Sequence, residues 1–294
     1  MLKRLRRAHP VGYCLLTEVV FLAVLMVVPV LLVLLLAMLG VDLTRVDDYF
    51  LSAIQELLGA LVAVFFLKKT DRLGLLRRRG SGFFNGILVG MFPFAMICYT
   101  LYGKLLFGMP TDRPLRTGWQ IAWYFIGMFT VGVAEDFLFR GVIAQTLLEH
   151  FGTSRAGIWK ACLLSGLFFG GAHLTNILSS APFGVLMQCV FAGSLGVLFA
   201  AIYFRTGNLW VLVFLHGAQD AASLLAGGVA ANGRLRQLVN DGAQKLGAKV
   251  YLPELKFCGD NGAMIAAQGY YQYMAGHTAG LELNGLPTLP IDYE

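Results

Sequence analysis

Long apolar runs separated by short polar loops fill the first three quarters of the chain. A helix needs about 20 mostly apolar residues to cross the hydrocarbon core of a bilayer. The runs that reach or approach this length lie at about 15–39, 50–67, 83–107, 119–147, 158–178, 183–204 and 208–226. This pattern predicts an all-α polytopic membrane helical bundle of about seven spans.

The pattern changes near residue 228. Residues 229–294 contain no long apolar run and have the pattern of a small α/β fragment. Asn232–Leu246 and Asn261–Met274 have helical character, and Lys249–Leu252 has that of a short strand. We therefore expect a transmembrane domain over residues 1–228 and a C-terminal fragment that buries too little surface to fold robustly alone.

Composition supports the membrane assignment. The chain is 57% hydrophobic and only 14% charged, with a mean hydropathy of +0.68, whereas a soluble domain carries about a quarter of charged residues. The excess apolar surface is expected to face membrane lipid. The net charge is +6, but the basic residues lie at helix ends and form no continuous face. We therefore expect no nucleic-acid partner.

Basic residues also predict the orientation. They precede the first span at Lys3, Arg4, Arg6 and Arg7, follow the second at Lys68, Lys69, Arg72, Arg77, Arg78 and Arg79, and recur at Arg155, Lys160 and Arg205. Cytoplasmic loops of membrane proteins carry such an excess. The first apolar run is longer than the core of a signal peptide and has no small-residue cleavage site, so we interpret it as a retained span. The sequence thus predicts an integral plasma-membrane protein with a cytoplasmic N-terminus.

Ionisable residues interrupt three of the later spans. The fourth carries Glu135-Asp136-Phe-Leu-Phe-Arg140, the fifth carries His173 after two glycines, and the seventh carries His216-Gly-Ala-Gln-Asp220. Such groups cost several kcal/mol at membrane depth unless they are paired, so each needs a structural or functional reason.

Helical spacing separates the charged residues of the fourth span. Asp136 and Arg140 are four residues apart, so they share a helix face and can form an ion pair. Glu135 is rotated by about 100° from Asp136. One carboxylate, that of Glu135, is therefore free to point elsewhere.

The free carboxylate and the residues of the other two spans form a minimum set for activating a water molecule. Glu135 would act as the base, and His173 would hold or polarise the water or a metal. His216 and Asp220 share one helix face and would complete either a metal site or an oxyanion hole.

Structural roles remain as alternatives. Asp136–Arg140 could only lock a helix, His173 could bond a backbone carbonyl, and His216–Asp220 could be a polar staple. All three being structural would require three separately costly burials.

Other features narrow the class of enzyme. Glu18 and Glu56, in the first two spans, have no comparable partners and are interpreted as boundary or staple residues. The sequence contains neither HExxH nor GxSxG, which argues against a soluble zincin and against serine-type intramembrane proteolysis.

The three polar motifs resemble those of the CAAX-protease and bacteriocin-processing family, also called CPBP or Abi, whose patterns are EExxxR, FxxxH and HxxxN/D on successive spans. This chain has Glu135-Asp136-xxx-Arg140, Phe169-xxx-His173 and His216-xxx-Asp220 in that order. The resemblance covers about 119–226. One departure is visible, because Asp136 stands where the family has a second glutamate.

The resemblance implies an intramembrane endopeptidase of the CAAX type. Glu135 and His173 would activate the attacking water, and His216 with Asp220 would stabilise the oxyanion. A divalent metal such as zinc is an open alternative, held by Glu135, His173 and His216. The implied supporting residues are Asp136, Arg140 and Phe169.

The same resemblance leaves the substrate and even catalysis open. The substrate could be a peptide, a prenylated protein or a bacteriocin-like protein. A non-catalytic membrane protein of the bacteriocin-immunity type is the alternative, using the same polar cluster for binding.

The tail resembles a different family. Gly227, Gly228 and Asn232, followed by Asp260 in a Cys-Gly-Asp-Asn run, are similar to the C-terminal end of the tRNA threonylcarbamoyladenosine transferase, which has an actin/Hsp70-like ATPase fold. In that family the glycine block contacts nucleotide and the matching aspartate binds a metal. Because the rest of that enzyme has no counterpart upstream, we interpret about 225–275 as a fusion remnant. Nucleotide binding related to tRNA modification is the alternative.

Overall fold

The computed structural model describes residues 1–42, 46–107, 118–178, 180 and 182–225, and within them the side chains of 104–107 and 225 are left out. This part of the chain is helical and contains no strand. The predicted C-terminal fragment over 229–294, including its expected strand, lies outside the described residues.

The described residues form ten α-helices and three irregular helices. In chain order they are α1 (Leu2–Ala8), α2 (Pro10–Met38), α3 (Asp48–Lys69), α4 (Phe83–Val89), α5 (Met91–Phe107), α6 (Gly118–Asp136), α7 (Gln145–Phe151), α8 (Arg155–Ala172), α9 (Pro182–Thr206) and α10 (Leu209–Leu225). Three further segments are the 3-10 helix η2 (Leu73–Arg77), the π-helix η3 (Phe137–Ala144) and the 3-10 helix η4 (His173–Leu178).

The membrane character is confirmed, but the count of about seven spans is not. Five helical stretches of the described chain are long and apolar enough to cross a bilayer, with α6, η3 and α7 counted together as Gly118–Phe151. The pair α4 and α5 would add a sixth, although it is bent by 84°. The last apolar helix, over Leu209–Leu224, is shorter than a full span.

Close packing against α10 accompanies the bend between α4 and α5. A Cβ atom on Gly86 would lie 2.4 Å from Val211 Cγ2, and one on Gly90 would lie 2.6 Å from Leu215 Cδ1. The two glycines therefore let the bent pair approach α10 more closely than any side chain would allow. Uniform hydropathy over 83–107 gives no sign of this break, which is why the sequence predicts one straight span there.

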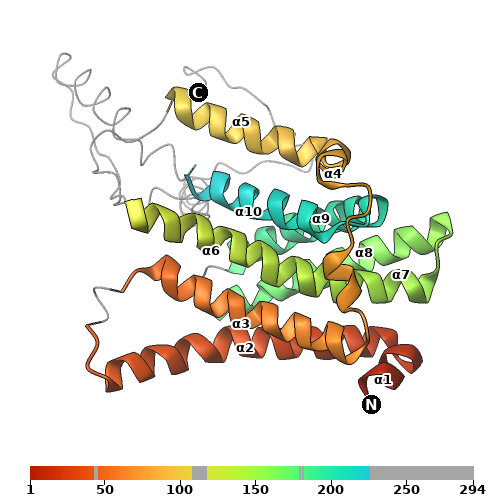
Figure 1. Cartoon of the computed structure of the whole chain (residues 1–294), viewed down its shortest axis with the longest axis horizontal. Helices are drawn as coiled ribbons and strands as arrows, with labels where there is room; N and C mark the ends of the chain where they lie inside the picture. Colours follow the sequence, from red (N-terminus) through yellow and green to blue (C-terminus); the bar gives the residue numbers. More distant parts are fainter. Residues whose placement is uncertain (43–45, 108–117, 179, 181, 226–294) are drawn as a thin grey trace, which may run out of the picture. The chain divides into compact units, whose positions relative to one another are not determined.

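The long helices pack side by side in a bundle of mixed direction, in which α3 runs antiparallel to α2 but parallel to α6 (Figure 1). Helix α3 packs on both α2 and α6, and α10 packs on both α6 and α5 (Figure 1). Helices α8 and α9 form a close pair: a Cβ atom on Gly170 would lie 2.5 Å from the Cys189 carbonyl oxygen. Small residues of this kind let helices approach closely in membranes, where lipid gives little hydrophobic drive for association.

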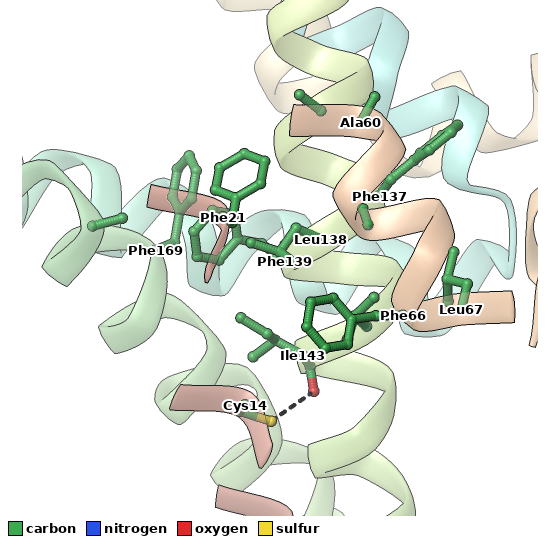
Figure 2. Packing of buried hydrophobic residues seen from close by; sticks show 14 of the residues in the cluster. Cys14, Phe21, Ala60, Phe66, Leu67, Phe137, Leu138, Phe139, Ile143 and Phe169 are labelled. Carbon is green, nitrogen blue, oxygen red and sulfur yellow. Dashed lines mark hydrogen bonds between the residues drawn. The ribbon is translucent and has the colours of Figure 1, made fainter. Parts of the chain in front are cut away.

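The core centres on the π-helix η3, all of whose residues are buried. Phe139 and Ile143 project from η3 toward Phe21 and Cys14 of α2, and Phe66 of α3 fills the space beside them (Figure 2). The Cys14 thiol donates a hydrogen bond to the Ile143 carbonyl oxygen at 3.9 Å. A π-helical segment at the centre of a bundle is notable because such segments frequently occur at functional sites.

Ion pairs join three segments at one end of the bundle. Glu149 of α7 accepts hydrogen bonds from Arg6 of α1, at 2.7 Å, and from Arg72 after α3. Lys3 of α1 pairs with Asp71. The N-terminus, the turn after α3 and the end of α7 therefore lie together.

Backbone contacts bring the end of α9 to the same place. Ser81 N–H donates to the Thr206 carbonyl oxygen at 2.9 Å, and the Asn208 amide donates to the Arg79 carbonyl oxygen at 3.1 Å. The basic clusters that flank the predicted spans thus gather at one end of the bundle.

Candidate active site

His216 of α10 lies among three carboxyl groups. Its Nδ1 is 3.2 Å from Asp136 Oδ2, and its Nε2 is 3.5 Å from Glu135 Oε2 and 3.7 Å from Asp220 Oδ2. The imidazole is almost fully buried. Because an ionised carboxylate only accepts hydrogen bonds, Nδ1–H donates to Asp136, and this bond sets the orientation of the ring.

Asp136 also neutralises Arg140. The two side chains are fully buried, with Arg140 Nη1 3.1 Å from Asp136 Oδ1. The guanidinium carbon lies 4.3 Å from the centroid of Phe169 and 5.1 Å from that of Phe199, so two aromatic faces hold the cation as well. The predicted Asp136–Arg140 ion pair is therefore present. Its carboxylate does more than lock the helix, because it also orients His216.

His173 begins η4, directly after α8. Its Nδ1 lies 2.8 Å from the Phe169 carbonyl oxygen, and since a carbonyl only accepts, Nδ1–H is the donor. This is the backbone bond that a structural role would require. It occupies one nitrogen only, so Nε2 of the neutral ring keeps its lone pair.

Glu135 and His173 line a common cavity of about 450 Å³. The α2 part of the lining is apolar, and the rest is mostly polar. The lining comprises Phe21, Leu22, Leu25, Met26, Gln55, Glu56, Glu135, Phe139, Ala172, His173, Thr175, Asn176, Leu178 and Gln188. His216 and Asp220 are not part of this lining. His216 lies next to Glu135, and Asp220 lies next to His216. The structure thus brings the four predicted residues into one cluster, with two at the cavity wall and two behind.

The interpretation of Glu56 as a boundary or staple residue is wrong. Glu56 lies inside α3, is 8% exposed, and lines the same cavity as Glu135 and His173. The available signal was the polar pair Gln55–Glu56 in the middle of an apolar run, since a charged residue inside a span marks a functional site by default.

The expected metal ligands do not form a metal site. Within the described residues, no group of three or more His, Cys, Asp or Glu side chains is arranged to hold a metal ion. Of the three expected ligands, only Glu135 and His173 line the cavity, and His216 uses its Nδ1 to bond Asp136. The donor set therefore does not fit a bound zinc ion.

Comparison with known proteins identifies two segments. Residues 117–222 match the family model described as "Type II CAAX prenyl endopeptidase Rce1-like". This segment includes every residue of the candidate site except those contributed by α2 and α3. Residues 211–267 match the model of the tRNA N6-adenosine threonylcarbamoyltransferase.

Curated relatives include proteins named for the same tRNA modification. A probable bifunctional tRNA threonylcarbamoyladenosine biosynthesis protein of Methanosarcina barkeri is 56% identical over 59 residues, which are 20% of this chain and 11% of that protein. The tRNA N6-adenosine threonylcarbamoyltransferase of Carboxydothermus hydrogenoformans is 47% identical over 80 residues, which are 27% of this chain and 24% of that protein.

This chain therefore spans only a small part of those relatives' length. No solved structure matches the chain. The resemblances to two families are confirmed: the chain is similar to Rce1-like CAAX prenyl endopeptidases over residues 117–222 and to the tRNA N6-adenosine threonylcarbamoyltransferase over residues 211–267.

Proposed function

We propose that this chain is an intramembrane endopeptidase of the CAAX type, which hydrolyses a peptide bond of a membrane-associated protein with a water molecule held between Glu135 and His173. The observation that carries the proposal is the shared cavity: both residues line it, inside an apolar helical bundle, with Glu135 next to His216. The family match over 117–222 supports the same class of reaction.

The first half of the reaction is water attack. Glu135 takes one proton from the water, whose oxygen forms a bond to the carbonyl carbon of the substrate peptide. His173 Nε2 accepts a hydrogen bond from the second water hydrogen and so directs the oxygen lone pair at the carbon. The carbonyl oxygen becomes an oxyanion.

His216 stabilises that oxyanion in the proposed mechanism. Its Nε2 lies at 3.5 and 3.7 Å from the nearest carboxyl oxygens, at or beyond the limit of a hydrogen bond. Because Nδ1–H is bound to Asp136, the ring has an Nε2–H only as the doubly protonated imidazolium, whose charge the surrounding carboxyl groups stabilise. In the proposed mechanism this Nε2–H donates to the oxyanion, while Asp136 holds the ring from the other side. When the C–N bond breaks, Glu135 passes its proton to the departing amine.

The position of His216 along α10 limits the kind of substrate that can reach it. His216 lies about 10 Å along α10 from its first residue and about 13 Å from its last, at about 1.5 Å per residue. A peptide must enter the apolar bundle to reach it. We propose a membrane-associated peptide for that reason, either prenylated or bacteriocin-like.

We further propose that the bundle lies in the plasma membrane with its N-terminus in the cytoplasm. The ion-paired end that carries Lys3, Arg6 and Arg72 also carries the turn at Arg79 and the end of α9. This grouping is what the excess of basic residues on cytoplasmic loops requires.

The proposal is tested by cleavage of a prenylated CAAX-type peptide by the purified protein in liposomes. Glu135→Gln and His173→Ala should each reduce cleavage to background while the protein remains folded in detergent. Glu149→Gln is the matched control, because the same substitution lies at the ion-paired end of the bundle, on a residue outside the cavity lining. Full activity of Glu135→Gln would refute the assignment, and bacteriocin immunity that persists in that variant would favour the non-catalytic alternative.

For the tail we propose no independent transferase activity. The supporting observation is its coverage: the matched relatives share only 11–24% of their length with this chain. ATP binding by the full-length protein that disappears in Asn232→Ala would contradict this proposal and would give Gly227, Gly228 and Asp260 a nucleotide- or metal-binding role.

A further inference from the structure

The cavity contains a second glutamate that the proposed mechanism does not use. Glu56 comes from α3, on a wall of the cavity outside the segment that matches the protease family. It is 8% exposed, and its Oε2 is buried without a hydrogen-bond partner. A buried polar atom of this kind requires a partner, and here the adjacent space is the cavity itself.

Glu56 differs from the other carboxyl groups of the cluster in its pairing. Glu135 and Asp220 lie near His216, and Asp136 contacts both His216 and Arg140. Glu56 makes no ion pair within the described residues. An unpaired carboxylate is costly deep in an apolar bundle, and further negative charge nearby increases that cost. The neutral acid avoids this cost and gains a hydroxyl group that can donate a hydrogen bond.

The surroundings of Glu56 suit a peptide backbone. Gln55, Asn176 and Gln188 also line the cavity, and the Asn176 amide donates to Gln188 Oε1 at 2.9 Å. Amide side chains offer both donors and acceptors, as a peptide backbone does. The apolar residues that α2 contributes to the lining leave the polar contacts of a bound peptide to these side chains of the other elements.

We propose that Glu56 is a substrate-binding residue that, as a neutral acid, donates a hydrogen bond to a backbone carbonyl of the peptide held in the cavity. This inference rests on the proposed endopeptidase function. A backbone carbonyl is common to all peptides, so the contact positions the chain for attack without selecting a side chain. A carboxylic acid kept neutral by an apolar site can act as such a donor.

The experiment compares Glu56→Gln and Glu56→Met in the full-length protein with a prenylated CAAX-type peptide. Gln keeps a donor at nearly the same position, so kcat/KM should stay within about threefold of the wild type. Met keeps the length of the side chain but loses the donor, so KM should rise about tenfold while kcat stays within about threefold, as expected for a lost hydrogen bond in binding.

Glu18 supplies the matched control. It is also a buried glutamate, 6% exposed, but it lies on α2 in a separate apolar cavity of about 340 Å³ with neighbours such as Leu164 and Leu167. Glu18→Gln and Glu18→Met should leave KM unchanged. Thermal unfolding in detergent checks that each variant is folded, and Glu56→Ala replaces Glu56→Met if the latter does not fold.

A binding measurement separates this inference from the proposed function. In the Glu135→Gln background, which should bind but not cleave, Glu56→Met should raise the Kd of the same peptide about tenfold. Equal loss in Glu56→Gln and Glu56→Met would show that the charge of Glu56 matters, as in recognition of a basic side chain, and would overturn the inference. Unchanged KM and Kd in Glu56→Met would overturn it too. Wild-type cleavage by Glu135→Gln alone would instead overturn the proposed function.

Discussion

His216 Nδ1 lies 3.2 Å from Asp136 Oδ2, although the two residues are 80 positions apart in the chain. The other carboxylate oxygen of Asp136 faces Arg140. A single buried carboxylate therefore neutralises a cation on its own helix and orients an imidazole on another. Replacing Asp136 should therefore affect both the stability of the protein and its proposed activity. Two substitutions made together can separate these two effects.

Asp136→Leu should destabilise the protein strongly and abolish cleavage. It leaves the fully buried Arg140 without its counter-ion, at a cost of about 3–5 kcal/mol. It also removes the acceptor of His216 Nδ1–H. Adding Arg140→Met removes the unpaired charge and should restore most of the thermal stability in detergent, but not the cleavage, because His216 still has no acceptor.

Arg155→Met is the control for that experiment. Arg155 is an exposed arginine at the start of α8, and its loss should change the free energy of unfolding by less than about 0.5 kcal/mol. Recovery of cleavage in the double variant would show that Asp136 acts only as the counter-ion of Arg140.

Two adjacent glycines of α8 should respond in opposite ways to alanine. At Gly170 a Cβ atom would lie 2.5 Å from the Cys189 carbonyl oxygen, and backbone cannot give way cheaply. Gly170→Ala should therefore separate α8 from α9, cost about 1–3 kcal/mol, and lower cleavage because His173 lies three residues further along. Gly171→Ala, which meets nothing within 4 Å, should be neutral or slightly stabilising. Equal effects of the two variants on thermal stability would contradict the close α8–α9 contact.

Metal chelation should leave cleavage unchanged. The reason is the arrangement of the donors: His216 bonds Asp136 through Nδ1 and does not line the cavity, and Glu135 and His173 alone do not make a complete ligand set. The measurement is peptide cleavage after treatment of the purified protein with a strong zinc chelator. Loss of activity that added zinc restores would instead support the metal that the family resemblance allows.

The membrane orientation can be read from two exposed serines. Ser81 lies beside the end of α9, and Ser180 lies just beyond η4, across one span from the start of α8. In a cysteine-free background, Ser180→Cys should react with a membrane-impermeant maleimide in intact cells. Ser81→Cys should react only after permeabilisation, because it lies at the basic end. The reverse labelling pattern would place the N-terminus outside.

The sequence predicts the later helices and their polar residues well, because both rest on local rules, although the last helix is shorter than a full span. Hydrophobic length identifies the helices, and a spacing of four places Asp136 with Arg140 and His216 with Asp220 on shared faces. The cost of burying charge then marks these residues as functional candidates. The third span is predicted less well, since the break at Gly90 depends on contacts with α10.

In the candidate site, too, some features follow from local rules and others depend on contacts between helices. Periodicity and the cost of burying charge act along a single helix, and they were enough to predict a membrane bundle with Glu135, His173, His216 and Asp220 as candidate residues. The three-dimensional packing was needed to show that Asp136 contacts both Arg140 and His216, and that Glu56 of α3 lines the same cavity as Glu135. These relationships depend on how separate helices pack and rotate against each other, and that packing is set by contacts between residues far apart in the chain.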